Sequence, residues 1–416
     1  MSDRLCWALI LVFCANSVSA DEPAGRKAAA LTAAGDSGQP PETAAYFTRP
    51  ASAGEAQVSA VRQGDAEIPL VVVRGTPYEM GRQLGKALQR QITTFIPPAL
   101  QGICSQMGVT EEQLQEVWSR TAAYADDRLE QELAGVADAV GMPLRTLQAM
   151  HAVPLLMPYS CSSIAAWGDA TEDGHLYQTR NLDWSLEIGA HNFAAIVIYV
   201  PDTGIPHVVP TFAGFCGAHT GMNFRGIALS EMGDASQKEA PYFVHAPHFT
   251  AFFRTMLYDA DSLTETLDIF ARQPMTKRYH FVFGDGQTDR RAVKVRAHAP
   301  EPADRRLLIW KDNDATDEFA PNVLSCVVYN DEGRGAFPTL KSGHGKLNGE
   351  SLVKLANQIP IKGGNVVNVV YDATALKMWV TYARGTEEAY QRPSVLIDLQ
   401  QAAGLRMEAK SRAAAP

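Results

Sequence analysis

The sequence predicts an α+β protein in which a helical segment precedes a largely antiparallel sheet. The chain has 416 residues, of which 46% are hydrophobic and 20% are charged, and this is the composition of a globular protein. Residues 110–150 repeat apolar side chains at three- and four-residue spacing, which indicates helices. From residue 161 onward, short β runs are separated by turn signals and by helical stretches, without the strict βαβ order of a parallel sheet.

The first residues predict export. Arg4 precedes the apolar run "LCWALILVFCA", and the small residues "SVSA" end at Ala20, so we expect residues 1–20 to be a signal peptide and the protein to be periplasmic or secreted. Residues 21–55 are rich in Ala, Gly, Pro, Ser and Thr and predict a flexible leader. We expect no transmembrane anchor, because no later apolar run reaches the length of a membrane span.

The charge balance and the missing motifs exclude several classes of function. With 37 basic and 46 acidic residues the net charge is −9, and without a long basic run nucleic acid is not an expected partner. The sequence has no Walker A loop, no G-x-S-x-G and no G-x-G-x-x-G, and His245 and His248 lie in "HAPH" rather than in HExxH. We therefore expect neither a metal ion nor an organic cofactor.

Local patterns predict the individual elements. Residues 67–75, "EIPLVVVRG", read as a buried strand, and Thr76, Pro77 and Glu79 form the N-cap, first position and capping box of a following helix. Further expected strands are "NFAAIVIYV", "HVVPTFAGF", "YHFVFGDG", "RAVKVRA", "NVLSCVVYN" and the hairpin "NVVNVVYDATALKMWVTYA", and further expected helices are "HFTAFFRTMLYDADSLTETLDIFARQ" and "GESLVKLANQI". The chain thus divides into a mainly helical segment at 56–160, a core at 161–400 and a flexible tail at 401–416.

A predicted β-hairpin begins at Cys161. Residues 161–167 form its first strand, "TEDG" its turn, and residues 175–183 its return strand. A turn centred between Glu172 and Asp173 places Cys161 opposite residue 184, give or take two. The turn alone therefore brings Arg180, Asn181 and Asp183 near the cysteine, whereas the register decides which of them shares its face.

The residue types of this hairpin suggest a nucleophilic thiol. A thiolate is the reactive form of cysteine, and a neighbouring guanidinium such as that of Arg180 lowers the thiol pKa. A chain cut before Cys161 would expose an α-amino group, whose ordinary pKa near 8 suits a general base. Asp183 could hold that amine in place. The alternative is that Arg180 and Asp183 form only a surface ion pair.

The stretch from Cys161 through "TRNLDW" resembles the cysteine N-terminal-nucleophile (Ntn) hydrolases. It is most similar to the isopenicillin N acyltransferase-like autoproteolytic family, to which penicillin V acylases, bile salt hydrolases and acid ceramidases are related. "GTPYEMGRQLG", "HTGMNFRGIAL" and "NVVNVVYDATALKMWV" look like further parts of the family pattern, in its order. Together these stretches cover most of residues 67–400.

The resemblance implies a four-layer αββα sandwich and a precursor that cuts itself. The Cys161 thiol would attack the Ser160 carbonyl, and the helical segment before the cut would stay bound as a small subunit. Cys161 would be the nucleophile and, through its amine, the base; Arg180 would support the thiolate and Asp183 would hold the amine. For the oxyanion hole, which stabilises the tetrahedral intermediate, the expected donors are the Asn330 side chain and the backbone N–H near Gly233.

The substrate-binding residues expected in the same region are Asn181, Trp184, Asn223 and Glu231. Two positions depart from the family pattern. Ser160 stands where the acyltransferase has Gly, and "LSEMGD" places Glu231 and Asp234 where several relatives have Asn. Asn330 has an alternative interpretation as a turn-forming residue before "DEG", and Cys104, Cys216 and Cys326 are expected to be structural.

The predicted function is that of an autoproteolytic cysteine amidohydrolase. It would cleave a linear amide, such as an N-acyl amino acid, an acyl-homoserine lactone or a β-lactam side chain, through a thioester on Cys161. An acyltransferase, a phospholipase B-like ester hydrolase and a non-enzymatic exported binding protein are the alternatives. The expected partners are a small amide or acyl substrate and the cleaved N-terminal segment, and a homo-oligomer is compatible with the sequence.

Overall fold

The computed structural model describes residues 54–156, 159–233, 244–297 and 307–405. The expected signal peptide, nearly all of the expected leader, Asp234 and most of the expected tail lie outside these residues. Within them, no helix combines the length and the apolar character needed to cross a membrane.

Nine strands form the larger of two sheets, in the order β1-β2-β5-β6-β7-β8-β9-β10-β11. Every neighbouring pair is antiparallel except β2 and β5, which are parallel. The strands are β1 (Gln57–Gln63), β2 (Ala66–Gly75), β5 (Ala194–Pro201), β6 (His207–Phe212), β7 (Thr220–Asn223), β8 (Ile227–Gly233), β9 (Tyr279–Asp285), β10 (Arg291–Ala297) and β11 (Leu307–Trp310).

The smaller sheet has six strands, all antiparallel, in the order β12-β3-β4-β13-β14-β15. They are β12 (Val327–Asn330), β3 (Ser160–Gly168), β4 (Gly174–Asp183), β13 (Asn365–Asp372), β14 (Lys377–Tyr382) and β15 (Val395–Asp398). The predicted hairpin at Cys161 is the β3–β4 pair at the centre of this sheet.

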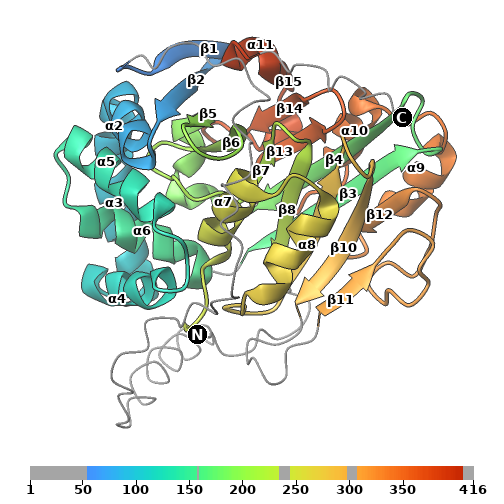
Figure 1. The fold of residues 1–416 in the computed structure, drawn as a ribbon, viewed down its shortest axis with the longest axis horizontal. Coiled ribbons are helices and arrows are strands. Elements are labelled where there is room, and N and C mark those ends of the chain that lie inside the picture. Colours follow the sequence, from blue (N-terminus) through green and yellow to red (C-terminus); the bar gives the residue numbers. More distant parts are fainter. Residues whose placement is uncertain (1–53, 157–158, 234–243, 298–306, 406–416) are drawn as a thin grey trace, which may run out of the picture.

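The two sheets pack face to face, with helices on their outer faces (Figure 1). Gln178 of β4 crosses the interface and donates hydrogen bonds to the Ala228 carbonyl and the Ser230 hydroxyl of β8. Helices α7 (Phe249–Asp259) and α8 (Leu263–Arg272) cover the nine-stranded sheet, and α9 (Ala336–Gly343) and α10 (Gly349–Ala356) cover the six-stranded sheet. The four-layer αββα order expected from the sequence is confirmed.

Five helices of the N-terminal segment gather at one side of the sandwich, on the left in Figure 1. They are α2 (Pro77–Ala87), α3 (Gln89–Met107), α4 (Glu111–Ala122), α5 (Arg128–Val140) and α6 (Leu144–Leu156). The predicted capping box of α2 is present, because the Thr76 side chain and Glu79 bond each other's backbone N–H. Short 3-10 helices span Leu186–Ile188, Ala190–Phe193 and Ala389–Gln391.

A buried ion pair ties this helical segment to the core. Arg254 of α7 donates to the Glu132 carboxylate of α5, and neither side chain is more than 2% exposed. Tyr258 donates a 2.6 Å hydrogen bond to the same carboxylate, and the Arg254 guanidinium lies 3.7 Å from the centre of the Tyr199 ring. The segment is therefore held by a charge pair whose partners come from opposite sides of Cys161 in the chain.

Three elements differ from the sequence-based expectation. Strand β1 begins within the stretch assigned to the helical segment, and residues 401–405 of the expected tail are ordered because α11 (Leu399–Ala403) buries its apolar side chains. The single helix expected between β8 and β9 is two helices. Ser262 is the N-cap of α8, because its side chain accepts a hydrogen bond from the Glu265 backbone. The apolar repeat continues across this cap, so the pattern alone predicts one helix.

Arg254→Leu is predicted to destabilise the protein by about 3–5 kcal/mol, because it leaves the Glu132 carboxylate buried without its counter-charge. Urea unfolding followed by circular dichroism measures the loss. Arg62→Leu is the control, since Arg62 and Glu67 form an exposed pair that contributes about 0–1 kcal/mol. Equal losses in the two variants would show that the buried pair does not hold the segment.

Candidate active site

The register of β3 and β4 decides which side chains share a face. Ser160 pairs with Asp183 and Cys161 pairs with Leu182, within the two residues of the expected position. Since alternate residues of a strand face opposite sides, Cys161, Arg180 and Leu182 point toward the nine-stranded sheet. Asp183 lies on the other face, toward α10.

The Cys161 thiol lies in a buried cluster of charged groups. Arg180 Nη2 donates to Cys161 Sγ at 3.2 Å and lies 3.8 Å from Glu231 Oε2. The Tyr159 hydroxyl donates to Glu231 Oε1 at 2.7 Å. Cys161, Arg180 and Glu231 are all fully buried, so these interactions act in a site largely shielded from water.

Two opposing effects act on the thiol. Burial disfavours the thiolate and raises the pKa of Cys161 to about 12, although the Arg180 guanidinium acts to lower it. Glu231, Asp183 and Glu332 add to the increase through their negative charge. In the uncut chain the thiol is thus mainly protonated at neutral pH, and Arg180 is the group that favours its ionisation.

Asp183 is held by two donors on the α10 side of the sheet. Arg334 Nη1 donates to Asp183 Oδ2 at 2.8 Å, and Asn365 Nδ2 donates to Oδ1 at 2.9 Å. Burial raises the Asp183 pKa above its ordinary value, while these donors and the Ile361 backbone act to lower it. The carboxylate is therefore fixed beside the backbone of Ser160, its partner across the ladder.

The Ser160–Cys161 peptide bond lies between two residues of the loop after β12. Arg334 Nη2 donates to the Cys161 carbonyl at 2.7 Å, and the Ser160 hydroxyl donates to Glu332 Oε2 at 2.7 Å. Arg334 thus links the Cys161 backbone to the Asp183 carboxylate. The two contacts flank the expected cleavage site, one at the Ser160 side chain and one at the carbonyl that follows Cys161.

The two expected oxyanion groups lie on β12 and β8, which both contact β3, the strand of Cys161. Asn330 pairs with Ser163, two residues beyond Cys161 on the same face, and its Nδ2 lies 3.8 Å from Met232 Sδ. The side chain is 2% exposed. Gly233 ends β8, and a Cβ at this position would approach the Tyr159 carbonyl oxygen to 2.9 Å, so glycine lets the two backbones meet.

The expected substrate-binding residues divide into two groups. Glu231 is at the thiol, and Trp184 lines the adjacent pocket. Asn181 points the other way and donates to the Ala356 carbonyl of α10 at 2.6 Å. Asn223 accepts from the Arg225 and Ile227 backbones, and it donates to the carbonyls of Leu257 in α7 and Ala260 just after α7. The structure thus gives Asn181 and Asn223 structural contacts and does not bring them to the thiol.

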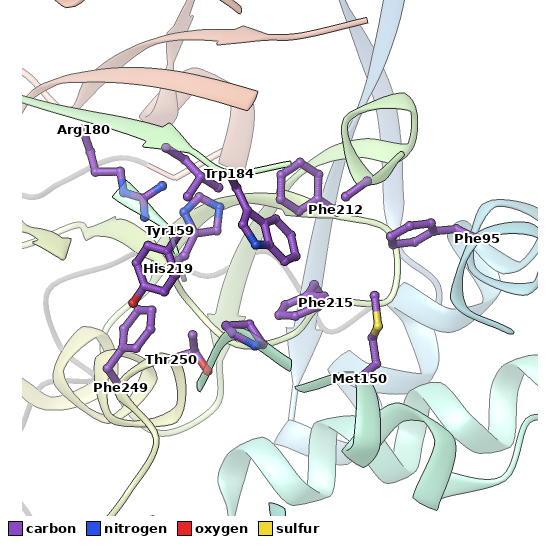
Figure 2. Close-up of a pocket in the computed structure, with 13 residues that line it drawn as sticks. Phe95, Met150, Tyr159, Arg180, Trp184, Phe212, Phe215, His219, Phe249 and Thr250 are labelled. Atoms are coloured by element: carbon purple, nitrogen blue, oxygen red, sulfur yellow. The ribbon is translucent and has the colours of Figure 1, made fainter. Parts of the chain in front are cut away.

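A narrow apolar pocket opens beside Arg180, with a cavity volume of about 40 Å³. Figure 2 shows Arg180, Tyr159 and His219 gathered at one end and Phe95 and Met150 at the other, with Trp184 between them. Phe95 belongs to α3 and Met150 to α6. The far end of the pocket is therefore built by the helical segment and the near end by the residues around the thiol.

Sequence reasoning missed Tyr159, Glu332, Arg334 and Asn365. Tyr159 adjoins the predicted cut, and Glu332 and Arg334 follow Asn330 directly, so their closeness in sequence to expected site residues was the available signal. For Asn365 there was none, because only the pairing of β13 with β4 brings it to Asp183. Among the described residues, Cys104, Cys161, Cys216 and Cys326 are free thiols.

Comparison with protein-family models returns no match. Two curated proteins of Dictyostelium discoideum are similar to the chain. Protein dcd1B is 25% identical over 295 residues, which are 64% of this chain and 56% of dcd1B. Protein dcd1A is 23% identical over 381 residues, 79% of this chain and 82% of dcd1A. The chain thus spans little more than half the length of the first of these relatives.

Three solved structures are also similar. A Caenorhabditis elegans ortholog of N-acylethanolamine-hydrolyzing acid amidase has 15% identity and a TM-score of 0.39, covering 57% of this chain and 100% of its own. Penicillin V acylase from Agrobacterium tumefaciens has 11% identity and a TM-score of 0.39, and the match covers 58% of this chain and 87% of the acylase. A mutant of conjugated bile acid hydrolase from Clostridium perfringens has 10% identity and a TM-score of 0.41, and the match covers 61% of this chain and 97% of the hydrolase. All three TM-scores are below 0.5, so the description of the fold rests on the four layers described above.

Arg180→Gln is predicted to slow alkylation of Cys161 by iodoacetamide at pH 8 by about tenfold. Loss of the guanidinium removes the main effect that lowers the thiol pKa, and a rise of one pKa unit reduces the thiolate about tenfold. Mass spectrometry of the peptide that contains Cys161 measures the rate. Arg180→Lys keeps the positive charge and should recover part of it, whereas an unchanged rate in Arg180→Gln would show that Arg180 does not control the thiol.

Proposed function

We propose that this protein is an Ntn-type cysteine hydrolase that cleaves a linear amide bond of a small molecule. The observation that carries the proposal is the 3.2 Å contact between Arg180 Nη2 and the Cys161 thiol, beside an apolar pocket that Arg180 also lines. The named activities of the three similar structures, an amidase, an acylase and a bile acid hydrolase, agree with this class of reaction.

The first step of the proposal is activation by self-cleavage. The Cys161 sulfur attacks the Ser160 carbonyl carbon, the bond from that carbon to the Cys161 nitrogen breaks, and the thiol proton ends on the released amine. Water then hydrolyses the thioester, which leaves a carboxylate on Ser160 and a free thiol on Cys161. Arg334 and Glu332, which contact the Cys161 carbonyl and the Ser160 hydroxyl, fix the residues on either side of the bond that is attacked.

The second step is turnover of the substrate. The new α-amine of Cys161, held near Asp183, takes the thiol proton, and Arg180 stabilises the thiolate. The sulfur attacks the substrate carbonyl, Asn330 and the backbone near Gly233 donate to the oxyanion, and the leaving amine takes the proton. Water completes the reaction by hydrolysing the acyl thioester. No cofactor enters this scheme.

The apolar pocket supports an acyl group as the part of the substrate that binds. Phe95 and Met150 at its far end belong to the segment before the cut, so the helical segment must remain bound for the pocket to be complete. We also propose export of the protein. An extracytoplasmic location favours hydrolysis over acyl transfer from coenzyme A, which is a cytosolic donor.

The purified protein is predicted to run as two bands on a denaturing gel. From 45.2 kDa for 416 residues, residues 21–160 and 161–416 correspond to fragments of about 15 and 28 kDa. Cys161→Ala removes the nucleophile and should leave a single uncut chain. N-terminal sequencing of the larger band should start at Cys161, and an uncut wild type would contradict the proposed activation.

Arg334→Leu is predicted to slow the appearance of the two bands by about tenfold or more. The substitution removes the charged donor to the Cys161 carbonyl and the Asp183 carboxylate, and such hydrogen bonds contribute about 1.5–3 kcal/mol. Densitometry of a pulse-chase time course, which follows newly made uncut chain as it is cleaved, measures the rate. Arg384→Leu, which changes an exposed arginine, serves as the control, and equal rates in both variants would exclude a role for Arg334 in cleavage.

The substrate class is tested by the release of fatty acid from a panel of N-acyl amino acids, acyl-homoserine lactones, penicillin V and phospholipids. Hydrolysis of amides that is lost in Cys161→Ala supports the proposal. Preferential release from phospholipids would favour an ester hydrolase. A cut but inactive protein that still binds the compounds would favour a binding protein with this fold.

A further inference from the structure

His219 differs from the other buried histidines near the site in its lack of hydrogen bonds. The residue is 8% exposed. Its ring interacts with the Pro210 backbone, but this contact does not reach hydrogen-bond geometry, and neither ring nitrogen has a hydrogen-bond partner. His151, by contrast, uses both of its nitrogens, one with the Leu147 carbonyl and one with the Cys216 backbone N–H. Buried polar groups are nearly always paired, so His219 requires an explanation.

The ring of His219 is positioned at the pocket beside the thiol. It stacks on Phe212, with 5.9 Å between ring centres, and lines the same pocket as Arg180 and Trp184. In Figure 2 it lies at the polar end of the pocket, next to Arg180 and Tyr159. Burial, with the neighbouring Arg180 charge, holds the pKa of His219 well below its ordinary value, so the imidazole is neutral.

A neutral imidazole has one N–H donor and one nitrogen lone pair. The Pro210 carbonyl interacts favourably with the ring proton, which leaves the lone pair to accept from a donor. Trp184 Nε1 and Arg180 Nη1 are donors that lack hydrogen bonds in the same pocket. A hydroxyl is the small neutral group that both donates to a lone pair and accepts from an N–H.

We propose that the pocket selects acyl groups that carry a hydroxyl close to the reacting carbonyl, and that His219 is the residue that recognises this hydroxyl. The inference rests on the proposed amide hydrolysis. The direction of the acyl chain follows from the pocket, because the carbonyl must lie at the thiol end and the chain must extend toward Phe95 and Met150. A hydroxyl near the carbonyl therefore meets His219, whereas one at the end of the chain meets apolar walls.

Three p-nitroanilides of equal chain length test the proposal, with octanoyl, 3-hydroxyoctanoyl and 8-hydroxyoctanoyl groups. Wild type should cleave the 3-hydroxyoctanoyl anilide with a kcat/KM about tenfold higher than the octanoyl anilide, because the octanoyl chain leaves the buried polar groups of the pocket without a partner. The 8-hydroxyoctanoyl anilide should be the poorest of the three. Equal values for the 3-hydroxyoctanoyl and octanoyl anilides would overturn the inference, while cleavage of none of the three would instead contradict the proposed function.

Variants of His219 test whether this residue recognises the substrate hydroxyl or only packs in the pocket. His219→Phe keeps the aromatic stacking and should abolish the preference for the 3-hydroxyoctanoyl over the octanoyl anilide, whereas His219→Gln should retain part of this preference. His207→Phe is the matched control, since His207 is also buried with an unpaired Nε2 but does not line the pocket, and it should keep the preference. An equal loss for all three anilides in His219→Phe, with unchanged thermal unfolding, would overturn the inference, because His219 would then act on the amide itself.

Discussion

The pairing register of β3 with β4 is the constraint on which the candidate site depends. Because Cys161 pairs with Leu182, the thiol and Arg180 share the face between the sheets, and Asp183 lies on the face toward α10. A slip of one residue would exchange these faces and separate the guanidinium from the sulfur. The register is secured on both sides, since β12 pairs with β3 and β13 pairs with β4, so the site lies within the sheet rather than at its edge.

The location of Cys161 between the two sheets also explains the opposing effects on the pKa of its thiol. Between two packed sheets, water does not stabilise a thiolate, and burial alone would keep the sulfur protonated. Arg180 opposes this effect, and its own charge is balanced by Glu231, which is equally buried. Arg180 is therefore the group that favours the thiolate in this buried position. In the proposed function, the amine released by self-cleavage would act as the base for the thiol during turnover.

The helical segment before Cys161 belongs to the site as much as the sheets do. Phe95 and Met150 form the apolar end of the pocket, and Glu132 is buried against Arg254. Separating the segment would expose the pocket wall and leave a buried arginine without its counter-charge. Both costs favour an N-terminal segment that stays bound after the peptide bond is cut, which is the arrangement that the proposed function requires.

The sequence by itself determined the local elements and the neighbourhood of the site. Apolar periodicity and turn residues predicted the hairpins, Thr76 and Glu79 predicted the start of α2, and the turn after Cys161 predicted that Arg180 and Asp183 return to it. These features depend on residues close together in the chain. Only the tertiary structure decided which face each side chain takes, that Asn181 and Asn223 make structural contacts, and that Asn365 and Arg334 hold Asp183. It also decided that Phe95, Met150 and His219 line one pocket, because strand pairing and layer packing join residues that no local pattern relates.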